Sequence, residues 1–251
     1  MKSVFVTWKD INDGMWYPVA KLTRDHDGYR LNYTKGSSHT NFIPFPRMTD
    51  MTKVYFSNDL FSFFQNRLLP KNRPEFRKML NWSGMNIEDY DELDMLSISG
   101  GARKTDQFRI TPQPVQTNDD TYSIRFFTSG VSHLPEENIE RIKHLGSGDT
   151  LSFEYENSNE FDCNAVLVTT IDDQKVKVGY CPKYFNCDVR ELLDTPELTE
   201  HSLTVTQVNL DAPAQYRLLC EFTTKWPNRF TPLVSEDYQP FEKTELAIAT
   251  V

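Results

Sequence analysis

The stretch that decides the fold of the second half of the chain lies between residues 123 and 184. It contains three blocks: IRFFTSGV at residues 124–131, NEFDCNAV at residues 159–166 and VGYCPK at residues 178–183. Aromatic residues that alternate with polar ones are typical of half-buried β-strands. The blocks therefore predict strands whose aromatic side chains are divided between a core and a surface.

Taken together and in this order, the three blocks resemble the HIRAN domain family. The resemblance covers residues 122–195. It implies a small β-barrel, related in shape to OB-folds, which in DNA-remodelling translocases captures the 3′ end of single-stranded DNA. On this basis we expect single-stranded DNA or a DNA 3′ end as the partner.

The same residues suit a nucleic-acid site without reference to the family. Aromatic faces stack on bases, and basic or amide side chains contact phosphates, sugars and base edges. The alternative is that some of the aromatic rings face the core, and for Phe127 an inward orientation predicts a loss of stability on truncation. The predicted nucleic-acid-binding residues are Arg125, Phe126, Asn159, Phe161, Asp162, Tyr180 and Lys183.

Composition limits the class of protein. The chain has 251 residues, of which 38% are hydrophobic, and its net charge is −9. Extended binding to duplex DNA needs clustered Lys and Arg, so a small pocket is expected instead. The sequence contains no apolar run long enough to span a bilayer, so we expect a cytoplasmic protein with no membrane partner. Its four cysteines lack zinc-site spacing and are expected to be reduced and mostly buried.

Prolines and polar turn formers at residues 111–121 predict a domain boundary. Before it, residues 4–8, 15–22 and 29–33 read as strands, and helices are expected from a cap at residues 57–59 to Arg67, over residues 74–82 and over residues 86–96. The predicted fold is α+β: a small N-terminal α/β domain (1–115), the HIRAN-like barrel with two helices (122–195), and a β-containing C-terminal extension (196–251) packing on the barrel. Trp226, Phe230, Tyr238 and Phe241 are its expected anchors.

The N-terminal half resembles the first subdomain of HipA-type kinases. The block FFQNRLLP at residues 63–70 is similar to that family's F-F-x-N-L-L-P motif. The chain lacks the sequence motifs of a kinase core, so kinase activity is not implied. A separately encoded HipA-like Ser/Thr kinase core is the implied partner. Its predicted contacts are Phe61, Phe64, Arg67 and Arg73.

No sequence motif predicts catalysis. The five histidines are scattered without a metal-binding pattern, and we expect no enzyme activity, no cofactor and no metal. Two functions remain open. The chain is either a DNA-binding accessory factor of a toxin-antitoxin, repair or defence system, or an antitoxin that regulates a HipA-like kinase.

Overall fold

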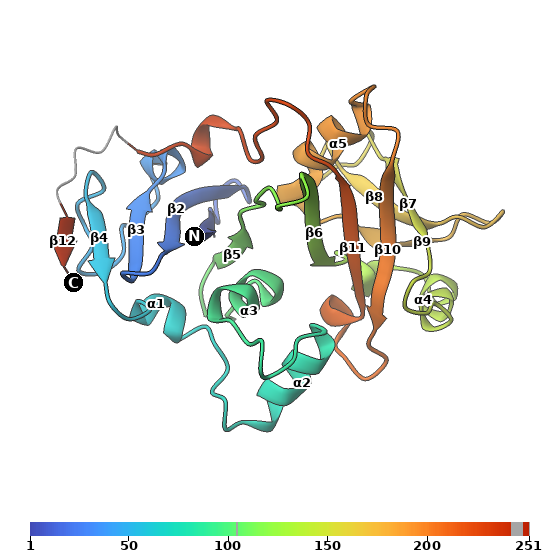
Figure 1. Cartoon of the computed structure of the whole chain (residues 1–251), viewed down its shortest axis with the longest axis horizontal. Helices are drawn as coiled ribbons and strands as arrows, with labels where there is room; N and C mark the ends of the chain where they lie inside the picture. The colour runs from blue at the N-terminus through green and yellow to red at the C-terminus, as the bar shows by residue number, and fades with distance from the viewer. Residues whose placement is uncertain (104, 242–247, 251) are drawn as a thin grey trace. The chain divides into compact units, whose positions relative to one another are not determined.

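The computed structural model describes residues 1–103, 105–241 and 248–250, which fold into two compact units (Figure 1). Unit 1 consists of Met1–Phe76, Glu88–Gln113 and Val234–Val251, and unit 2 of Arg77–Ile87 and Pro114–Leu233. The structure is of mixed α and β type, with antiparallel sheets and few helices. Among the described residues, no helix combines the length and apolar character that crossing a bilayer requires.

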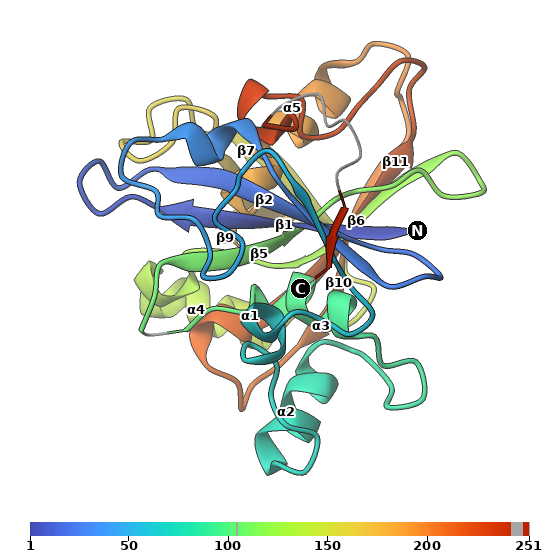
Figure 2. The same ribbon diagram turned by 90° about the vertical axis from the view of Figure 1, so that its left-hand side faces the viewer.

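Unit 1 is built on a six-stranded sheet in the order β12-β4-β3-β2-β1-β5, whose strands β1, β2 and β5 lie side by side in Figures 1 and 2. All neighbours are antiparallel except β12 and β4. The three strands predicted at its start are confirmed. The strands are β1 (Lys2–Lys9), β2 (Trp16–Arg24), β3 (Tyr29–Tyr33), β4 (Val54–Ser57), β5 (Phe108–Pro112) and β12 (Ile248–Thr250).

Two helices of unit 1 differ from the prediction. The helix expected from a cap at residues 57–59 to Arg67 is only α1 (Ser62–Gln65), whose N-cap position is Phe61; Ser57, one of the three proposed caps, ends strand β4. The helix expected over residues 86–96 is α3 (Glu92–Ser99), whose N-cap Asp91 accepts hydrogen bonds from two backbone amides. Gly100 ends α3 in the left-handed conformation, as the two glycines predicted.

The predicted partner-binding residues of unit 1 are mostly buried. Phe61 and Phe64 are 6% and 0% exposed and belong to the core. The Arg67 guanidinium forms a bidentate ion pair with Asp106 (Nη2–Oδ2 2.7 Å, Nη1–Oδ1 3.2 Å), and its side chain is 3% exposed. These three residues therefore cannot be surface anchors, which corrects the prediction; Arg73 alone of the four is exposed.

Unit 2 contains two three-stranded sheets, β10-β11-β6 and β7-β8-β9. Isolated bridges join residues of the two sheets: Ser129, which follows β6, to Tyr180 at the end of β9, and Thr150, which precedes β7, to Thr204 within β10. The strands are β6 (Thr121–Phe127), β7 (Leu151–Tyr155), β8 (Val166–Thr170), β9 (Lys177–Tyr180), β10 (His201–Val208) and β11 (Leu218–Lys225). The helices are α2 (Pro74–Trp82), at the bounds predicted and beginning in unit 1, α4 (Glu136–Lys143) and α5 (Asn186–Asp194).

Residues 196–251 are not a separate extension. Strands β10 and β11 form a sheet with β6, so the segment supplies two of the three strands. Of its expected anchors, Trp226 and Phe230 pack on Tyr122 in the core of unit 2. Further along the chain, Tyr238 makes an edge contact with Phe5 in unit 1 (4.8 Å between centroids), and Phe241 packs against the core of that unit.

Candidate nucleic-acid interface

The end of β9 is held against the residues that follow β6. Ser129 and Tyr180 exchange both backbone hydrogen bonds, at 2.8 and 2.9 Å. Gly179 has φ +143°, and a Cβ atom there would lie 2.7 Å from the Cβ of Thr128. Only glycine fits this close approach, which explains the VGY sequence and places the Tyr180 ring beside Gly130.

Four polar side chains meet around the Tyr180 hydroxyl, and we call them the Tyr180 cluster: Glu156, Asn159, Lys177 and Tyr180. The hydroxyl donates to Glu156 Oε2 (2.8 Å) and accepts from Lys177 Nζ, and Asn159 Nδ2 donates to the same Glu156 oxygen (2.5 Å). The hydrogen bond from Asn159, aided by that from Tyr180 and by the Lys177 ammonium, lowers the pKa of Glu156. The cluster therefore fixes an ionised carboxylate and an ammonium in one place.

The loop between β7 and β8, residues 156–165, is shaped by two residues that were predicted to bind nucleic acid. Asn159 Oδ1 accepts from the backbone amides of Phe161 (3.0 Å) and Asp162 (3.1 Å). Asp162 in turn accepts from the Asn164 amide (3.0 Å) and from Asn186 Nδ2 on α5 (2.8 Å). Such side-chain bonds to nearby backbone hold tight turns. Asn159 and Asp162 therefore order the loop.

Phe161 is the exposed aromatic residue of this loop. Its side chain is 86% exposed, and its backbone carbonyl accepts from Lys183 Nζ (3.2 Å). A second ammonium, that of Lys177, lies 4.0 Å from the centroid of the Tyr180 ring. The accessible Phe161 ring with Lys183 on its own carbonyl, and Lys177 on the Tyr180 ring, suit stacking of a single base with one or two phosphate contacts.

Five of the seven predicted residues come together here: Asn159, Phe161, Asp162, Tyr180 and Lys183. The prediction missed Glu156 and Lys177. Glu156 precedes the second block and Lys177 precedes the third. The two-residue period of a strand relates residues of the same strand, so it does not predict that these two side chains meet. Their contact depends on the pairing of both β7 and β9 with β8.

Arg125 lies elsewhere in unit 2, which corrects the prediction. Its Nη2 atom donates to the carbonyl of Ser83 (3.0 Å), just after the C-terminus of α2. Side chains from β10 and the residue after it bond the last carbonyls of the same helix, with Gln207 on Asn81 and Asn209 on Trp82, both at 2.9 Å. Helix C-termini leave carbonyls without partners inside the helix, so Arg125 contributes to a cap that holds α2.

Phe126 is 1% exposed and lies in the core beside Phe153 and Phe185. Its expected role as an accessible stacking ring is therefore wrong. Phe127, on the opposite face of β6, is also buried and contacts Tyr216 (5.2 Å between centroids). Both faces of β6 are covered at this end. The alternative that the aromatic ring faces the protein interior therefore holds for Phe127 and also for Phe126.

The cysteines divide into two pairs. All four are free thiols; Cys181 and Cys220 are buried, whereas Cys163 and Cys187 are exposed. The expectation that the thiols are mostly buried is thus wrong for the pair that lies on loop 156–165 and at the start of α5.

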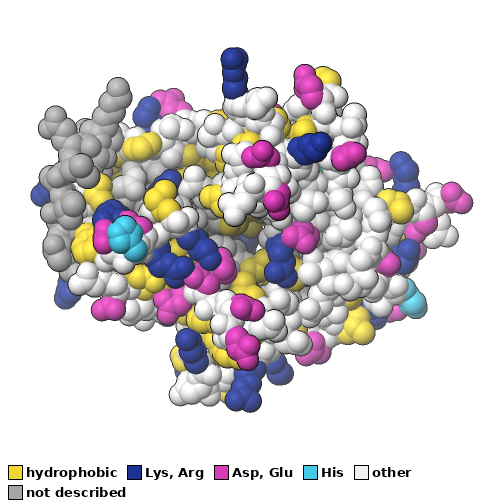
Figure 3. All heavy atoms as spheres, in the orientation of Figure 1, with side chains coloured by type: hydrophobic (Ala, Val, Ile, Leu, Met, Phe, Trp, Pro, Cys, Tyr) yellow, Lys and Arg dark blue, Asp and Glu magenta, His cyan; other side chains and the backbone are white. Residues whose placement is uncertain are grey.

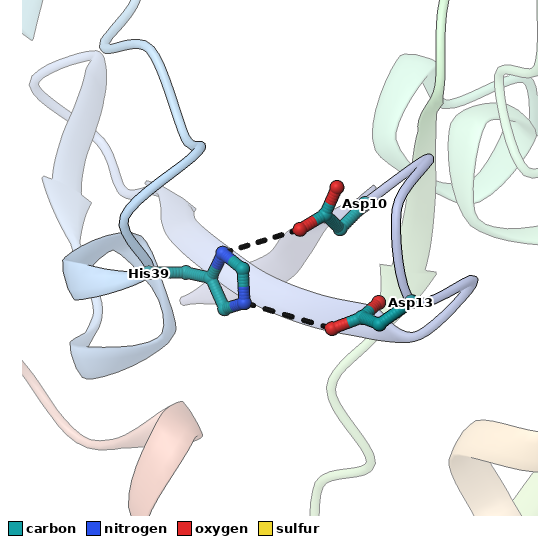
Figure 4. Close-up of side chains that lie close together, drawn as sticks. All are labelled: Asp10, Asp13 and His39. Atoms are coloured by element: carbon teal, nitrogen blue, oxygen red, sulfur yellow. Dashed lines mark ion pairs between the residues drawn. The ribbon is translucent and has the colours of Figure 1, made fainter.

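Among the described residues, Asp10, Asp13 and His39 of unit 1 form a group of metal-ligand type (Figure 4). His39 Nδ1 lies 3.5 Å from Asp10 and Nε2 lies 3.6 Å from Asp13. Because the two ring nitrogens face different carboxylates, the contacts of His39 join its own segment to the turn after β1. A second group, Asp25, His26 and Asp27, lies in the turn between β2 and β3.

Comparison with known proteins identifies the second half of the chain. Residues 121–227 match the HIRAN domain family, which supports the resemblance and extends it through β10 and β11. A crystal structure of a protein from Lactobacillus plantarum is 22% identical, with a TM-score of 0.33, covering 42% of this chain and 90% of that chain. The crystal structure of the HIRAN domain of human HLTF is 13% identical, with a TM-score of 0.32, covering 43% and 81%. No curated protein matches the chain.

Proposed function

We propose that this protein is a non-enzymatic DNA-binding factor that recognises single-stranded DNA at a 3′ end through its HIRAN domain. Loop 156–165 and the end of β9 form the proposed site. The observation that carries the proposal is the exposure of Phe161 on a loop whose backbone is already fixed by Asn159 and Asp162. The HIRAN match of residues 121–227 supports the same class of ligand.

Each group at the site has a distinct role in this proposal. The Phe161 ring stacks on a base, which contributes about 1–3 kcal/mol. Lys183 and Lys177 contact phosphate oxygens, whereas Asn159 and Asp162 keep the loop in its binding conformation. Because these hydrogen bonds order part of the loop before binding, part of the conformational entropy cost of binding DNA is already met in the free protein.

The charge distribution favours a short site over a long groove. The whole chain carries a net charge of −9, and on the face shown in Figure 3 the Lys and Arg side chains are interspersed with Asp and Glu. The Glu156 carboxylate shares the Tyr180 hydroxyl with the Lys177 ammonium, so an acidic group stands beside one of the two lysines of the site. An extended phosphate backbone would be repelled by such surroundings, whereas a strand end brings few phosphates.

The test is a pair of matched substitutions. We expect Phe161→Ala to weaken binding of a single-stranded oligonucleotide by about 1–3 kcal/mol, measured by fluorescence anisotropy, with the unfolding midpoint unchanged. Ile171→Ala is the control, because Ile171 is also a large exposed apolar residue (62%) and lies between β8 and β9, outside the proposed site. Equal affinities of the two variants would contradict the assignment of the site.

Recognition of the 3′ end is tested by changing the end of the oligonucleotide. Oligonucleotides of one sequence are compared with a free, a blocked and a phosphorylated 3′ end, beside a circular strand. The proposal expects tighter binding to the free end than to the circle. Equal affinity for the two would retain single-strand binding and overturn end recognition.

The biological setting stays a prediction. An accessory role in a toxin-antitoxin, repair or defence system is compatible with DNA binding. The burial of Phe61, Phe64 and Arg67 removes three of the four residues at which the binding of a HipA-like kinase core was predicted, and the kinase partner stays a prediction.

A further inference from the structure

Two exposed thiols lie on segments of unit 2 that contact each other beside the proposed DNA site. Cys163 lies on loop 156–165, and Cys187 lies in the first turn of α5. Residues that flank Cys163 contact α5 on both sides. Asp162 accepts from Asn186 (2.8 Å), and Asn164 Nδ2 lies 3.7 Å from Cys187 Sγ. Cys163 is thereby held between two contacts to the segment that carries Cys187.

We propose that Cys163 and Cys187 form a reversible disulfide on exposure to hydrogen peroxide, and that this bond locks loop 156–165 onto α5. The regulatory part of the inference rests on the proposed function, because the same loop carries Phe161. Formation of the bond does not rest on it. The loop is already tied to α5 by Arg190, which donates to the carbonyls of Asn164 and Ala165 (both 2.9 Å), so the two cysteines lie on segments that are held together.

The chemistry is a two-electron oxidation with peroxide as the oxidant. The thiolate of one cysteine attacks a peroxide oxygen, the O–O bond breaks, and a sulfenic acid and one water result. The second thiol then attacks the sulfenic sulfur and expels a second water. The two thiols lose two electrons and two protons, and one peroxide becomes two waters.

The surroundings assign the order of attack. Burial, together with Asp188 and Asp162, raises the pKa of the Cys187 thiol. A raised pKa leaves less thiolate at Cys187, so in the proposal Cys187 resolves the sulfenic acid that forms on Cys163. The other two thiols do not compete, because Cys181 and Cys220 are 2% and 0% exposed and burial raises both of their pKa values.

The first experiment maps the bond in the full chain. Protein treated with hydrogen peroxide is alkylated, digested and analysed by mass spectrometry. We expect loss of two of the four alkylatable thiols, a cross-linked peptide pair joining Cys163 to Cys187, and full reversal by dithiothreitol. Cys163→Ser and Cys187→Ser should each abolish the cross-link while the fold is retained. Intermolecular cross-links only, or oxidation of both residues without a cross-link, would overturn the proposal.

The second experiment measures the consequence for the loop. Amide hydrogen exchange of residues 156–165 should slow in the oxidised protein and stay unchanged in peroxide-treated Cys163→Ser; equal exchange in both would refute the lock. Affinity for the free-ended oligonucleotide should rise about three- to tenfold on oxidation, because less loop entropy is lost on binding. If reduced and oxidised protein both fail to bind DNA, the proposed function fails, and the mapped disulfide and slowed exchange still stand.

Discussion

Phe126 and Phe161 show how far two aromatic residues of one set of motifs can differ. Phe126 is 1% exposed and Phe161 is 86% exposed. Phe126 belongs to β6, which pairs with β11 in the sheet that covers the core of unit 2. Phe161 lies in a turn whose backbone bonds to Asn159, so its ring has no sheet to pack on. At both positions the local sequence is similar, because an aromatic residue stands next to a charged residue.

Substitution of Phe126 should therefore act on stability. We expect Phe126→Ala to lower the free energy of unfolding by about 3–5 kcal/mol, since a buried ring is replaced by a cavity. Chemical denaturation measures the change, with Phe161→Ala as the exposed counterpart expected to leave stability unaltered. A Phe126→Ala protein as stable as the parent would show that the ring does not pack in the core.

Asp188 is a buried carboxyl that gives stability a pH dependence. It is 3% exposed, accepts from the backbone amide of Leu233 (3.0 Å), and burial raises its pKa to about 6. The folded state thus holds the proton more tightly than the unfolded state, whose carboxyl has a pKa near 3.9. This contribution is present below about pH 4 and is lost as pH rises through about 6, amounting to about 3 kcal/mol.

The test is Asp188→Asn, which keeps the shape and removes the titration. Denaturation profiles from pH 4 to 7 should show the parent losing stability relative to the variant as pH rises. Parallel profiles would mean that Asp188 does not titrate in this range.

At the scale of elements, β9 depends on one glycine. Because Gly179 has φ +143° and would place a Cβ 2.7 Å from Thr128, Gly179→Ala should displace β9 from the end of β6. We expect a loss of more than about 1 kcal/mol of unfolding free energy and weaker DNA binding, because Tyr180 is the next residue.

Gly146 provides the control for that substitution. It follows α4, and a Cβ there would meet nothing within 4 Å. Gly146→Ala should be close to neutral in thermal denaturation. If the two variants melt together, the close approach of β9 to Thr128 does not constrain the sheet.

The elements themselves were predicted with uneven success. Strands such as β3 and β7 coincide with their predicted bounds, because alternation of buried and exposed side chains is written in the local sequence. The helix expected to reach Arg67 shrinks to one turn, because Phe61 and Phe64 are drawn into the core and Arg67 into a buried pair with Asp106. Those interactions reach across the sequence and leave no local signal.

At the scale of the whole molecule, the charge balance predicts the salt dependence of binding. If Lys177 and Lys183 are the phosphate contacts, log affinity against log salt should fall with a slope of about −0.7 per contact, or roughly −1 to −2 in total. Titrations of a single-stranded oligonucleotide at several salt concentrations give the slope. A value steeper than about −4 would require backbone contacts well beyond the proposed site.

The order of the two units along the chain is more complex than the sequence indicates. The change at Gln113–Pro114 falls within the proline-rich segment 111–121. Residues 77–87 also belong to unit 2, and the chain returns to unit 1 at Val234. These crossings were not predicted, because each depends on which core receives the apolar side chains.

By itself, the sequence determined the mixed α and β class, the strands with clear alternation and the HIRAN character of the second half. These features follow from local patterns of residues and from the order of the motifs along the chain. Only the tertiary structure decided which aromatic rings are accessible, that Arg125 caps α2, and that Glu156 and Lys177 join Tyr180. The physical reason is that exposure and polar contact depend on which strands pair and which faces are covered, and both depend on residues far apart in the sequence.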